Sequence, residues 1–175
     1  MVLLESENIQ MGEAAVDFAL EGIDGQEYSL ASFGEAQVLV VIFMCNHCPY
    51  VQKIWDGLVE LASELQPKGV AFVGINPNTA NPEYEEENME KMREYAQQYG
   101  MNFAYLEDVN QKVARAYRAQ CTPDIYVYDD ERKLAYHGRF DNDELKVACE
   151  ELLAGERPSK DEQRPSMGCS IKWVE

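Results

Sequence analysis

Residues 38–51 read Val38-Leu-Val-Val-Ile-Phe-Met-Cys-Asn-His-Cys-Pro-Tyr-Val51, and this stretch decides the fold. Its first seven residues, through Met44, are apolar and uncharged, which is typical of a strand buried on both faces of a parallel sheet. After the polar loop that follows, apolar residues recur at helical spacing as far as Leu65. The stretch therefore predicts a buried strand, a short loop and a helix.

Cys48 lies where that helix is predicted to begin. Pro49 suits the first helical turn, where its missing N–H costs nothing. The unpaired amides and the dipole of a helix N-terminus stabilise an anion, so they favour the thiolate form of the Cys48 side chain. A thiolate is the nucleophile in thiol–disulfide exchange and in attack on peroxides. We therefore expect Cys48 to be reactive, although a free cysteine is often only a small buried core residue.

The stretch Phe43–Val51 resembles the thioredoxin-type active site, in which an apolar strand leads into Cys-x-x-Cys at a helix start. Cys48 matches the first cysteine of that motif, but Val51 stands where the second would be. Another cysteine, Cys45, lies three residues upstream instead. The standard dithiol is therefore absent, and a second thiol is offered from the other side.

A second motif, Thr122-Pro123, is similar to the cis-proline loop that precedes a core strand in thioredoxin-like proteins. The resemblance implies that Pro123 is cis, that it faces Cys48, and that the loop of Thr122 offers backbone groups to a substrate. The segment 12–30 is similar to the opening of peroxiredoxin-like proteins. Together these segments resemble a cytosolic branch of the thioredoxin-like superfamily, either peroxiredoxin-like (AhpC/TSA-type redoxin) or thiol–disulfide isomerase.

Strands and helices alternate along the rest of the chain. We expect an N-terminal hairpin within 12–30, strands at 70–75, 102–106, 125–128 and 134–137, and helices at 110–119 and 142–153. The predicted fold is α/β and thioredoxin-like, with a central mixed sheet flanked by helices, the N-terminal hairpin and one inserted helix. The predicted parts are a loose arm (1–11), a thioredoxin-like domain (12–155), and a linker with a docking tail (156–175).

The inserted helix is expected between the strand at 70–75 and the Thr-Pro loop. Asn81 suits its N-cap and Pro82 its first position, so we expect a helix from there to Tyr99. Four acidic residues within 83–87 would then lie in its first turns, where they pair favourably with the helix dipole.

A second thiol is needed to complete a redox cycle, and Cys45 and Cys121 are the main candidates. Cys121 lies two residues before Pro123, and bridging to Cys48 requires Cα atoms within about 7 Å. His47 precedes the nucleophile and, as a cation, would help to stabilise the thiolate. A role for Cys169 as a C-terminal resolving cysteine, as in some peroxiredoxins, stays open at this point.

Three functions fit these residues. The first is a thiol–disulfide oxidoreductase, in which Cys48 attacks a disulfide and Cys45 or Cys121 resolves the mixed disulfide. The second is a thiol peroxidase, in which a hydroperoxide oxidises Cys48 to a sulfenic acid. Peroxiredoxins carry Pro-x-x-x-Thr-x-x-Cys, and Val41 and Cys45 occupy the Pro and Thr positions here, which favours the first function. The third is a non-catalytic redox sensor or binding module.

Composition narrows the partners. A net charge of −17 over 175 residues argues against nucleic acid and anionic membranes as partners. No apolar run approaches the roughly 20 residues that span a bilayer, and acids near the N-terminus do not fit a signal peptide, so we expect a cytoplasmic protein. We expect a disulfide or hydroperoxide substrate, a thioredoxin-type or low-molecular-weight thiol reductant, and no cofactor. A zinc site of Cys45, His47, Cys48 and Cys121 is only weakly indicated, so no metal is predicted.

Overall fold

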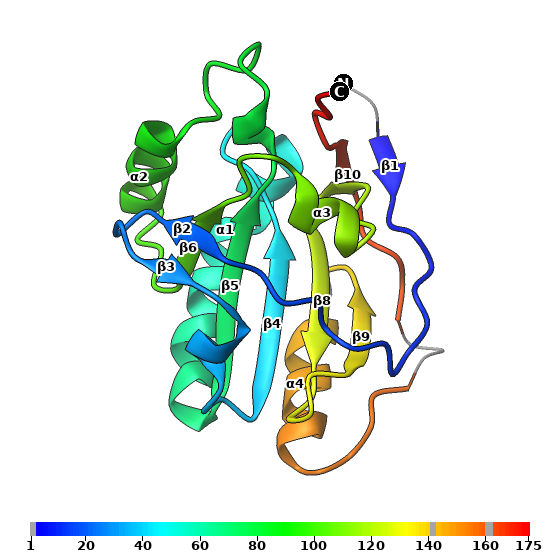
Figure 1. Ribbon diagram of the computed structural model, residues 1–175. Helices are drawn as coiled ribbons and strands as arrows, with labels where there is room; N and C mark the ends of the chain where they lie inside the picture. The colour runs from blue at the N-terminus through cyan, green and yellow to red at the C-terminus, as the bar shows by residue number, and fades with distance from the viewer. Residues whose placement is uncertain (1–2, 141–142, 160–162) are drawn as a thin grey trace.

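The computed structural model describes residues 3–140, 143–159 and 163–175. Its centre is a seven-stranded sheet in the order β3-β2-β6-β5-β4-β8-β9 (Figure 1). The strands of this sheet are β2 (Leu20–Gly22), β3 (Glu27–Tyr28), β4 (Val38–Phe43), β5 (Val70–Asn76), β6 (Ala104–Glu107), β8 (Asp124–Tyr128) and β9 (Leu134–Gly138). Strand β4 runs parallel to β5 and antiparallel to β8, so the sheet is mixed, as predicted.

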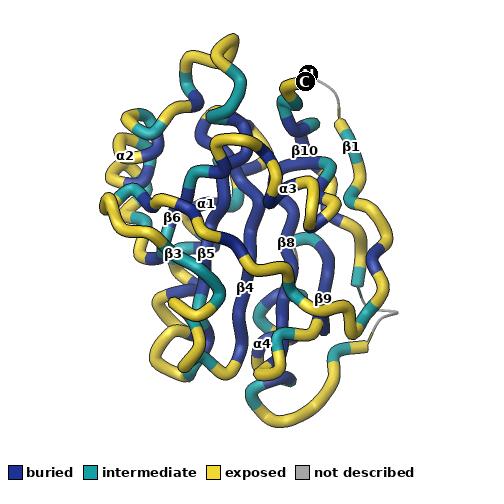
Figure 2. The backbone as a smooth tube through the Cα atoms, viewed as in Figure 1, coloured by how far each residue is buried: buried dark blue, intermediate teal, exposed yellow. Residues whose placement is uncertain are grey.

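Strand β4 holds the middle of the molecule, because all six of its residues are fully buried. Its side chains alternate between the two faces of the sheet. Val40 and Ile42 belong to one core cluster, and Val41 and Phe43 belong to the other. A strand without a polar residue is stable here because both faces are covered, as Figure 2 shows by the buried colour of β4.

Helices cover the two faces unequally. The face with Val40 packs against α1 (Pro49–Leu65), α2 (Met89–Gln98) and α4 (Glu144–Leu153). The other face packs against the short α3 (Lys112–Ala116), the N-terminal segment and the C-terminal tail. Short 3-10 turns lie at η1 (Leu30–Phe33), η2 (Gln66–Lys68) and η3 (Asn78–Ala80). Among the described residues, no helix has both the length and the apolar character to cross a bilayer.

A second, three-stranded sheet joins both ends of the chain to the middle. Its order is β1 (Leu3–Glu5), β10 (Met167–Ser170) and β7 (Cys121–Thr122), all antiparallel. The expectation of a loose N-terminal arm is therefore wrong for residues 3–5, because their backbone groups are paired with β10. The tail docks as expected: Ile171 is buried, and the guanidinium of Arg115 lies 4.4 Å from the centre of the Trp173 ring.

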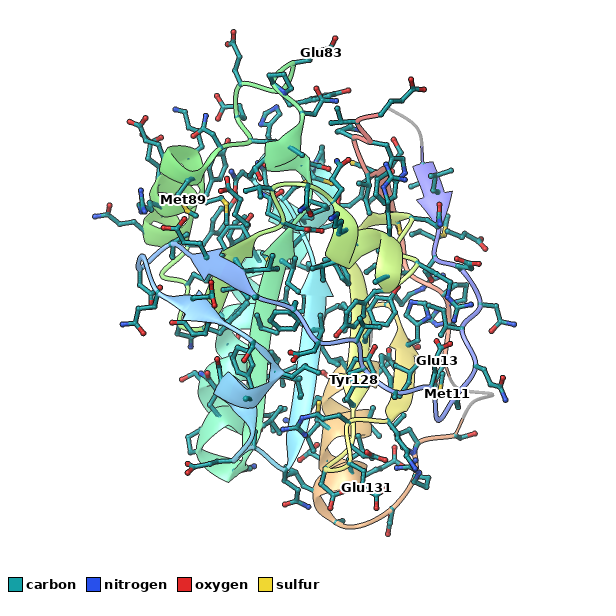
Figure 3. The ribbon with its side chains drawn as sticks, viewed as in Figure 1. Met11, Glu13, Glu83, Met89, Tyr128 and Glu131 are labelled. Atoms are coloured by element: carbon teal, nitrogen blue, oxygen red, sulfur yellow. The ribbon has the colours of Figure 1, made fainter. Side chains whose placement is uncertain are left out.

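The predicted N-terminal hairpin is present as β2 and β3, but the inserted helix starts later than predicted. Helix α2 begins at Met89, and Asn88 caps it by accepting a 2.8 Å hydrogen bond from the Lys91 amide. The side chain of Asn81 instead accepts from the Glu83 amide and forms a turn. Figure 3 shows Glu83 on the outer loop and Met89 at the start of the helix. The acidic residues at 83–87 therefore belong to a loop and do not act as first-turn residues.

Strands β5, β8 and β9 each extend one residue beyond their predicted ranges, whereas the two other predicted helices differ more. The helix expected at 110–119 spans only Lys112–Ala116. The helix expected at 142–153 is present as Glu144–Leu153, and its expected first residue, 142, lies outside the described residues. Strands β2 and β3 pair over only a few residues. Most of residues 12–19 lie before β2 and form one isolated bridge, between Ala14 and Lys133.

Candidate active site

Cys48 is the N-cap residue of α1, and Pro49 occupies the first position of that helix. Its side chain reaches the Thr122-Pro123 loop, where Sγ lies 3.5 Å from the carbonyl oxygen of Thr122. The residue is only 1% exposed. The thiol therefore lies at the helix N-terminus, as the sequence predicts, but it is covered more fully than an open surface site.

The Thr122–Pro123 peptide bond is cis, as the resemblance implied. Thr122 ends β7 and Asp124 begins β8, so the cis bond joins the small sheet to the central sheet. Strand β8 pairs with β4, which leads directly into the loop of Cys48. This pairing brings the two motifs together from positions about 75 residues apart in the sequence.

Cys45 lies beneath Cys48 at the end of β4 and is 2% exposed. Its Sγ is 3.4 Å from Oγ1 of Thr122. Hydrogen bonding with the Cys45 thiol is the largest cause that lowers the pKa of Cys48, which falls to about 5 although burial opposes the shift. The same contact, with burial and the nearby Glu87, raises the pKa of Cys45 well above its ordinary value. The two shifts have opposite directions, which favours the proton on Cys45 and the negative charge on Cys48.

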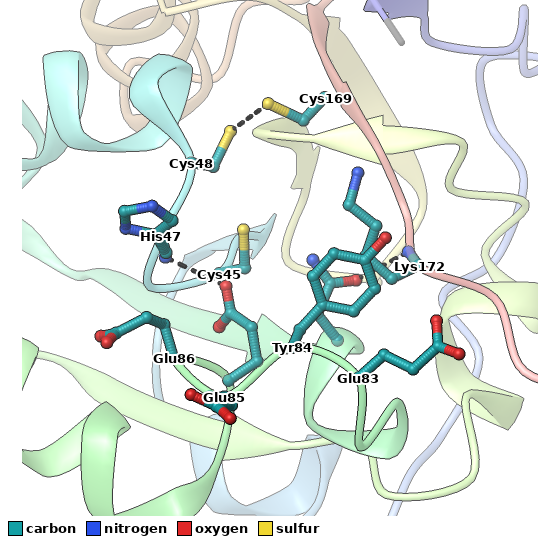
Figure 4. Close-up of a pocket in the computed structure, with 11 residues that line it drawn as sticks. Cys45, His47, Cys48, Glu83, Tyr84, Glu85, Glu86, Cys169 and Lys172 are labelled. Carbon is teal, nitrogen blue, oxygen red and sulfur yellow. Dashed lines mark hydrogen bonds between the residues drawn. The ribbon is translucent and has the colours of Figure 1, made fainter. Parts of the chain in front are cut away.

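Cys169 brings a third thiol to the site. Its Sγ lies 2.7 Å from Sγ of Cys48 (Figure 4). Burial raises the pKa of Cys169 to about 12, and the neighbouring Cys48 contributes to the shift. The sequence indicated only that the tail docks. Nothing local in residues 165–174 shows which side chain the tail would bring to Cys48, because that depends on the register of β10 against β7.

Cys121 lies next to the cis-proline loop, as predicted. Its Sγ contacts the carbonyl oxygens of Pro123, at 3.8 Å, and Ser166, at 4.0 Å. Burial raises the pKa of this thiol far above its ordinary value. Cys149 is fully buried in α4, as expected for a core residue.

Glu87 holds the loop that precedes Cys48, whereas its sequence context predicted a pairing with a helix dipole. Its carboxylate accepts hydrogen bonds from the amides of Asn46, at 2.9 Å, and His47, at 3.0 Å, and from Nδ2 of Asn76, at 3.1 Å. Burial raises the pKa of Glu87 although these hydrogen bonds oppose the shift. The carboxylate thus fixes the backbone just before Cys48. The His47 side chain is exposed on the same loop.

A pocket of about 410 Å³ opens beside the thiols. Figure 4 shows Cys45, Cys48 and Cys169 on one side of it and the loop before α2 on the other. That loop lines the pocket with residues 83–87, four of which are acidic, while His47 and Lys172 are the basic residues of the lining. A molecule that reaches the sulfur of Cys48 through this pocket therefore meets mostly negative charge. Within the described part of the chain, no cluster of three or more His, Cys, Asp or Glu residues has an arrangement that could hold a metal ion.

A buried polar pair lies behind the cis-proline. The Oδ1 atom of Asp124 is 2.8 Å from Nε2 of His137, and the Tyr126 hydroxyl donates to Oδ2 at 3.1 Å. The Tyr126 ring stacks on His137 with ring centres 4.2 Å apart. These contacts give Asp124, for which the sequence indicated no role, a structural partner on the neighbouring strand β9.

Similar proteins of known sequence include two redox proteins. A Helicobacter pylori protein with the provisional name peroxiredoxin bcp is 26% identical over 65% of this chain and 68% of its own. The thiol-disulfide oxidoreductase ResA of Halalkalibacterium halodurans is 26% identical over 64% of this chain and 58% of its own. The prediction of a thiol-based redox enzyme agrees with both names.

Solved structures confirm the predicted fold. An uncharacterized conserved protein from Geobacillus kaustophilus is 39% identical, with a TM-score of 0.95 over 99% of this chain and 97% of that chain. The hypothetical protein SMc02350 from Sinorhizobium meliloti is 38% identical, with a TM-score of 0.94 over 97% and 98%. The thioredoxin domain of a thiol-disulfide oxidoreductase from Bacteroides vulgatus is 17% identical and shares the fold, with a TM-score of 0.71 over 83% and 99%.

The family assignment comes from the sequence itself. A model of the AhpC/TSA family matches residues 11–137, which include β4, the Cys48 loop and the cis-proline. The match covers most of the chain, and the predicted resemblance to AhpC/TSA-type redoxins is confirmed. This chain belongs to the AhpC/TSA family.

Proposed function

We propose that this protein is a thiol–disulfide oxidoreductase with Cys48 as its nucleophile. The observation that carries the proposal is the setting of one sulfur: Cys48 caps a helix, lies against the cis Thr122–Pro123 bond and has a pKa of about 5. Most of this thiol is ionised at neutral pH, and a thiolate attacks disulfides. The Cys48 thiolate attacks one sulfur of the substrate, forms a mixed disulfide and releases the other half as a thiolate.

The other predicted site residues have supporting roles in this proposal. Cys45 donates a hydrogen bond to the thiolate, and Thr122 and Pro123 form the wall against which the substrate sulfur would lie. His47 is exposed at the pocket, beside the mostly acidic loop. The cycle needs a second sulfur to resolve the mixed disulfide, and Cys45 and Cys121 stay predictions for that role.

The narrow access favours a small disulfide, or an exposed disulfide at the tip of a protein loop. Cys48 is 1% exposed and is reached through a pocket of about 410 Å³. The oxidised enzyme would be returned to its dithiol form by a thioredoxin-type protein or a low-molecular-weight thiol. We propose the cytoplasm as its location, because a reducing compartment would keep its five cysteines reduced.

A thiol peroxidase is the second candidate, and two observations favour it. The chain belongs to the AhpC/TSA family, and the covered position of Cys48 admits a small hydroperoxide more readily than a folded protein. Val41, however, is a buried residue of β4, and Cys45 hydrogen-bonds Thr122. Neither position carries the Pro or Thr of the peroxiredoxin motif, so we rank this activity second.

The test compares two oxidants. The reduced protein is mixed with hydroxyethyl disulfide or with hydrogen peroxide, and the products are mapped by mass spectrometry. We expect a mixed disulfide on Cys48, slow consumption of peroxide, and loss of both reactions in Cys48→Ser. The variant Cys149→Ala removes a buried thiol from α4 and serves as the matched control, which should react like the natural protein. Rapid peroxide consumption with a sulfenic acid on Cys48 would support the peroxidase, and a Cys48 no faster than an ordinary exposed thiol would support a sensor or binding module.

A further inference from the structure

Cys169 is placed for a bond to the nucleophile. The two Sγ atoms are 2.7 Å apart although 121 positions separate the residues in the sequence. A disulfide bond is about 2.05 Å long, so joining these sulfurs requires only a small movement of the tail. The pair also lines the pocket, which leaves the Cys48–Cys169 contact within reach of small molecules.

Strand β10 holds Cys169 in this place through its pairing with the cis-proline loop. Cys169 is opposite Thr122 in the register of β10 and β7. The preceding residue, Gly168, lies so close to the loop that an added Cβ would overlap the carbonyl oxygen of Thr122. Only glycine at position 168 therefore lets β10 approach the loop closely enough to bring the thiol to Cys48.

The residues after β10 fasten the tail. Ile171 is buried in the core cluster on the α3 face. The side chain of Gln111 donates to the carbonyl oxygen of Lys172 at 2.9 Å and accepts from the Val174 amide at 2.8 Å. Asn78 accepts from the Lys172 amide at 3.0 Å. These three hydrogen bonds are made by backbone groups of the tail. They therefore set the position of Cys169 independently of the substrate.

Resting on the proposed oxidoreductase function, we propose that Cys169 is the resolving thiol and that the oxidised enzyme carries a Cys48–Cys169 disulfide. In the first step the Cys48 thiolate forms a mixed disulfide with one half of the substrate, and the other half leaves as a thiolate. In the second step Cys169 attacks Sγ of Cys48, the bond between Cys48 and the substrate breaks, and the second half leaves. The proton of Cys169 passes to that leaving thiolate. Two electrons have then moved from the two cysteines to the substrate, and an external dithiol returns them.

The charges around the thiols favour Cys169 in the second step. In the reduced protein, burial and the Cys48 thiolate raise the pKa of Cys169. The mixed disulfide removes that thiolate, and the two groups that lower the pKa of Cys169, Lys172 and the Tyr50 amide, stay in place. Cys45 also loses its hydrogen bond to the thiolate, but it keeps Glu87 nearby, which raises its pKa.

The experiment follows the fate of the mixed disulfide. The reduced full chain is mixed with hydroxyethyl disulfide, quenched with acid at intervals and digested, and linked peptides are identified. The natural protein, Cys45→Ser, Cys121→Ser and the control Cys149→Ala should all give a peptide that joins Cys48 to Cys169. Cys169→Ser should form the mixed disulfide on Cys48 and hold it at least about a hundredfold longer, since it lacks the neighbouring sulfur. Gly168→Ala keeps all five thiols but displaces β10, so closure of the Cys48–Cys169 bond should slow about a hundredfold relative to formation of the mixed disulfide.

Two results would overturn the assignment of Cys169 and leave the proposed function intact. One is a linked peptide that joins Cys48 to Cys45 or Cys121 in the natural protein. The other is a Cys169→Ser variant that releases the second half of the substrate as fast as the natural protein. A protein in which Cys48 forms no mixed disulfide in any variant would contradict the oxidoreductase function, and the resolving role of Cys169 with it.

Discussion

At the residue scale, the site depends on a division of roles between two cysteines three positions apart. Hydrogen bonding between them lowers the pKa of Cys48 and raises that of Cys45, which favours the negative charge on Cys48 and the proton on Cys45. The loop between them is too short to allow either side chain to move far. The Cys-x-x-Cys spacing therefore places a hydrogen-bond donor beside the sulfur of Cys48, whether or not the two sulfurs ever form a disulfide.

Removal of the Cys45 thiol should raise the pKa of Cys48. We expect Cys45→Ala to move it from about 5 toward the ordinary value of 9.0, because the largest stabilising contact is lost while burial continues to disfavour the charge. Since only the thiolate is alkylated, the rate at neutral pH should fall. The measurement is the rate of iodoacetamide alkylation of Cys48 as a function of pH. Cys45→Ser retains a donor and is the control, and equal pH profiles for the Ala and Ser variants would contradict the assigned role.

Local sequence predicted the place of Cys48 but not its surroundings. The position of Cys48 at a helix start and the cis Thr122–Pro123 bond were predictable because each is part of a short motif with its own local geometry. The contacts of Glu87 and Cys169 were not, because they are made across 41 and 121 positions. A run of acids before a helix has the composition of a favourable first turn. Only the folded chain shows that one of these carboxylates accepts hydrogen bonds from the backbone amides of the Cys48 loop.

At the element scale, buried strands were easier to predict than helix boundaries. Strand β4 has no polar residue, so its burial on both faces followed directly from composition. Two asparagines, Asn81 and Asn88, are both good N-caps, and local propensity does not distinguish between them. The tertiary contacts of Glu87 settle the choice, because they hold the intervening residues in a loop. Short pairings such as β1 with β10 were missed because neither segment has a strand pattern of its own.

The pairing of β8 with β9 gives an element-scale prediction. Asp124 and His137 form a hydrogen bond between these strands at fully or nearly fully buried positions. His137→Phe keeps an aromatic ring that can stack on Tyr126 but removes the partner of Oδ1 of Asp124, while the Tyr126 hydroxyl still donates to Oδ2. We expect the free energy of unfolding to fall by about 1.5–3 kcal/mol, the usual contribution of a hydrogen bond to a charged group. Urea unfolding measures the change.

The matched control for this pair is the double variant Asp124→Asn with His137→Phe, which replaces the buried carboxylate with a neutral amide. It should recover part of the lost stability, because an uncharged group costs less to bury without a partner. If the single and double variants unfold at the same urea concentration, the hydrogen bond contributes nothing measurable, and another contact must anchor the cis-proline end of β8.

At the scale of the whole molecule, the fold brings both ends of the chain to the reactive sulfur. Figure 1 shows β1 and β10 side by side at the edge of the molecule, apart from the central sheet. Strand β10 then pairs with β7, whose last residue precedes the cis-proline. A peptide substrate that adds as a strand beside Thr122 would find this edge already occupied by the protein's own tail. The remaining approach is the pocket beside the tail, so the charge of that pocket should decide which disulfides react.

This charge gives the last prediction. The chain carries a net charge of −17, and the loop at 83–87 lines the pocket with four carboxylates. At low salt, the cationic disulfide cystamine should therefore react with Cys48 roughly tenfold faster than neutral hydroxyethyl disulfide, because the pocket attracts positive charge. Oxidised glutathione, which is anionic, should be the slowest.

Since the Debye length shrinks from about 10 Å at 0.1 M salt to about 3 Å at 1 M, the differences in rate should narrow as salt is added. A variant with Glu83 and Glu85 changed to Gln should also narrow the differences in reaction rate at low salt. Neither glutamate is a hydrogen-bond partner of the Cys48 loop. Equal rates for the three disulfides at low salt would show that the acidic loop does not select the substrate.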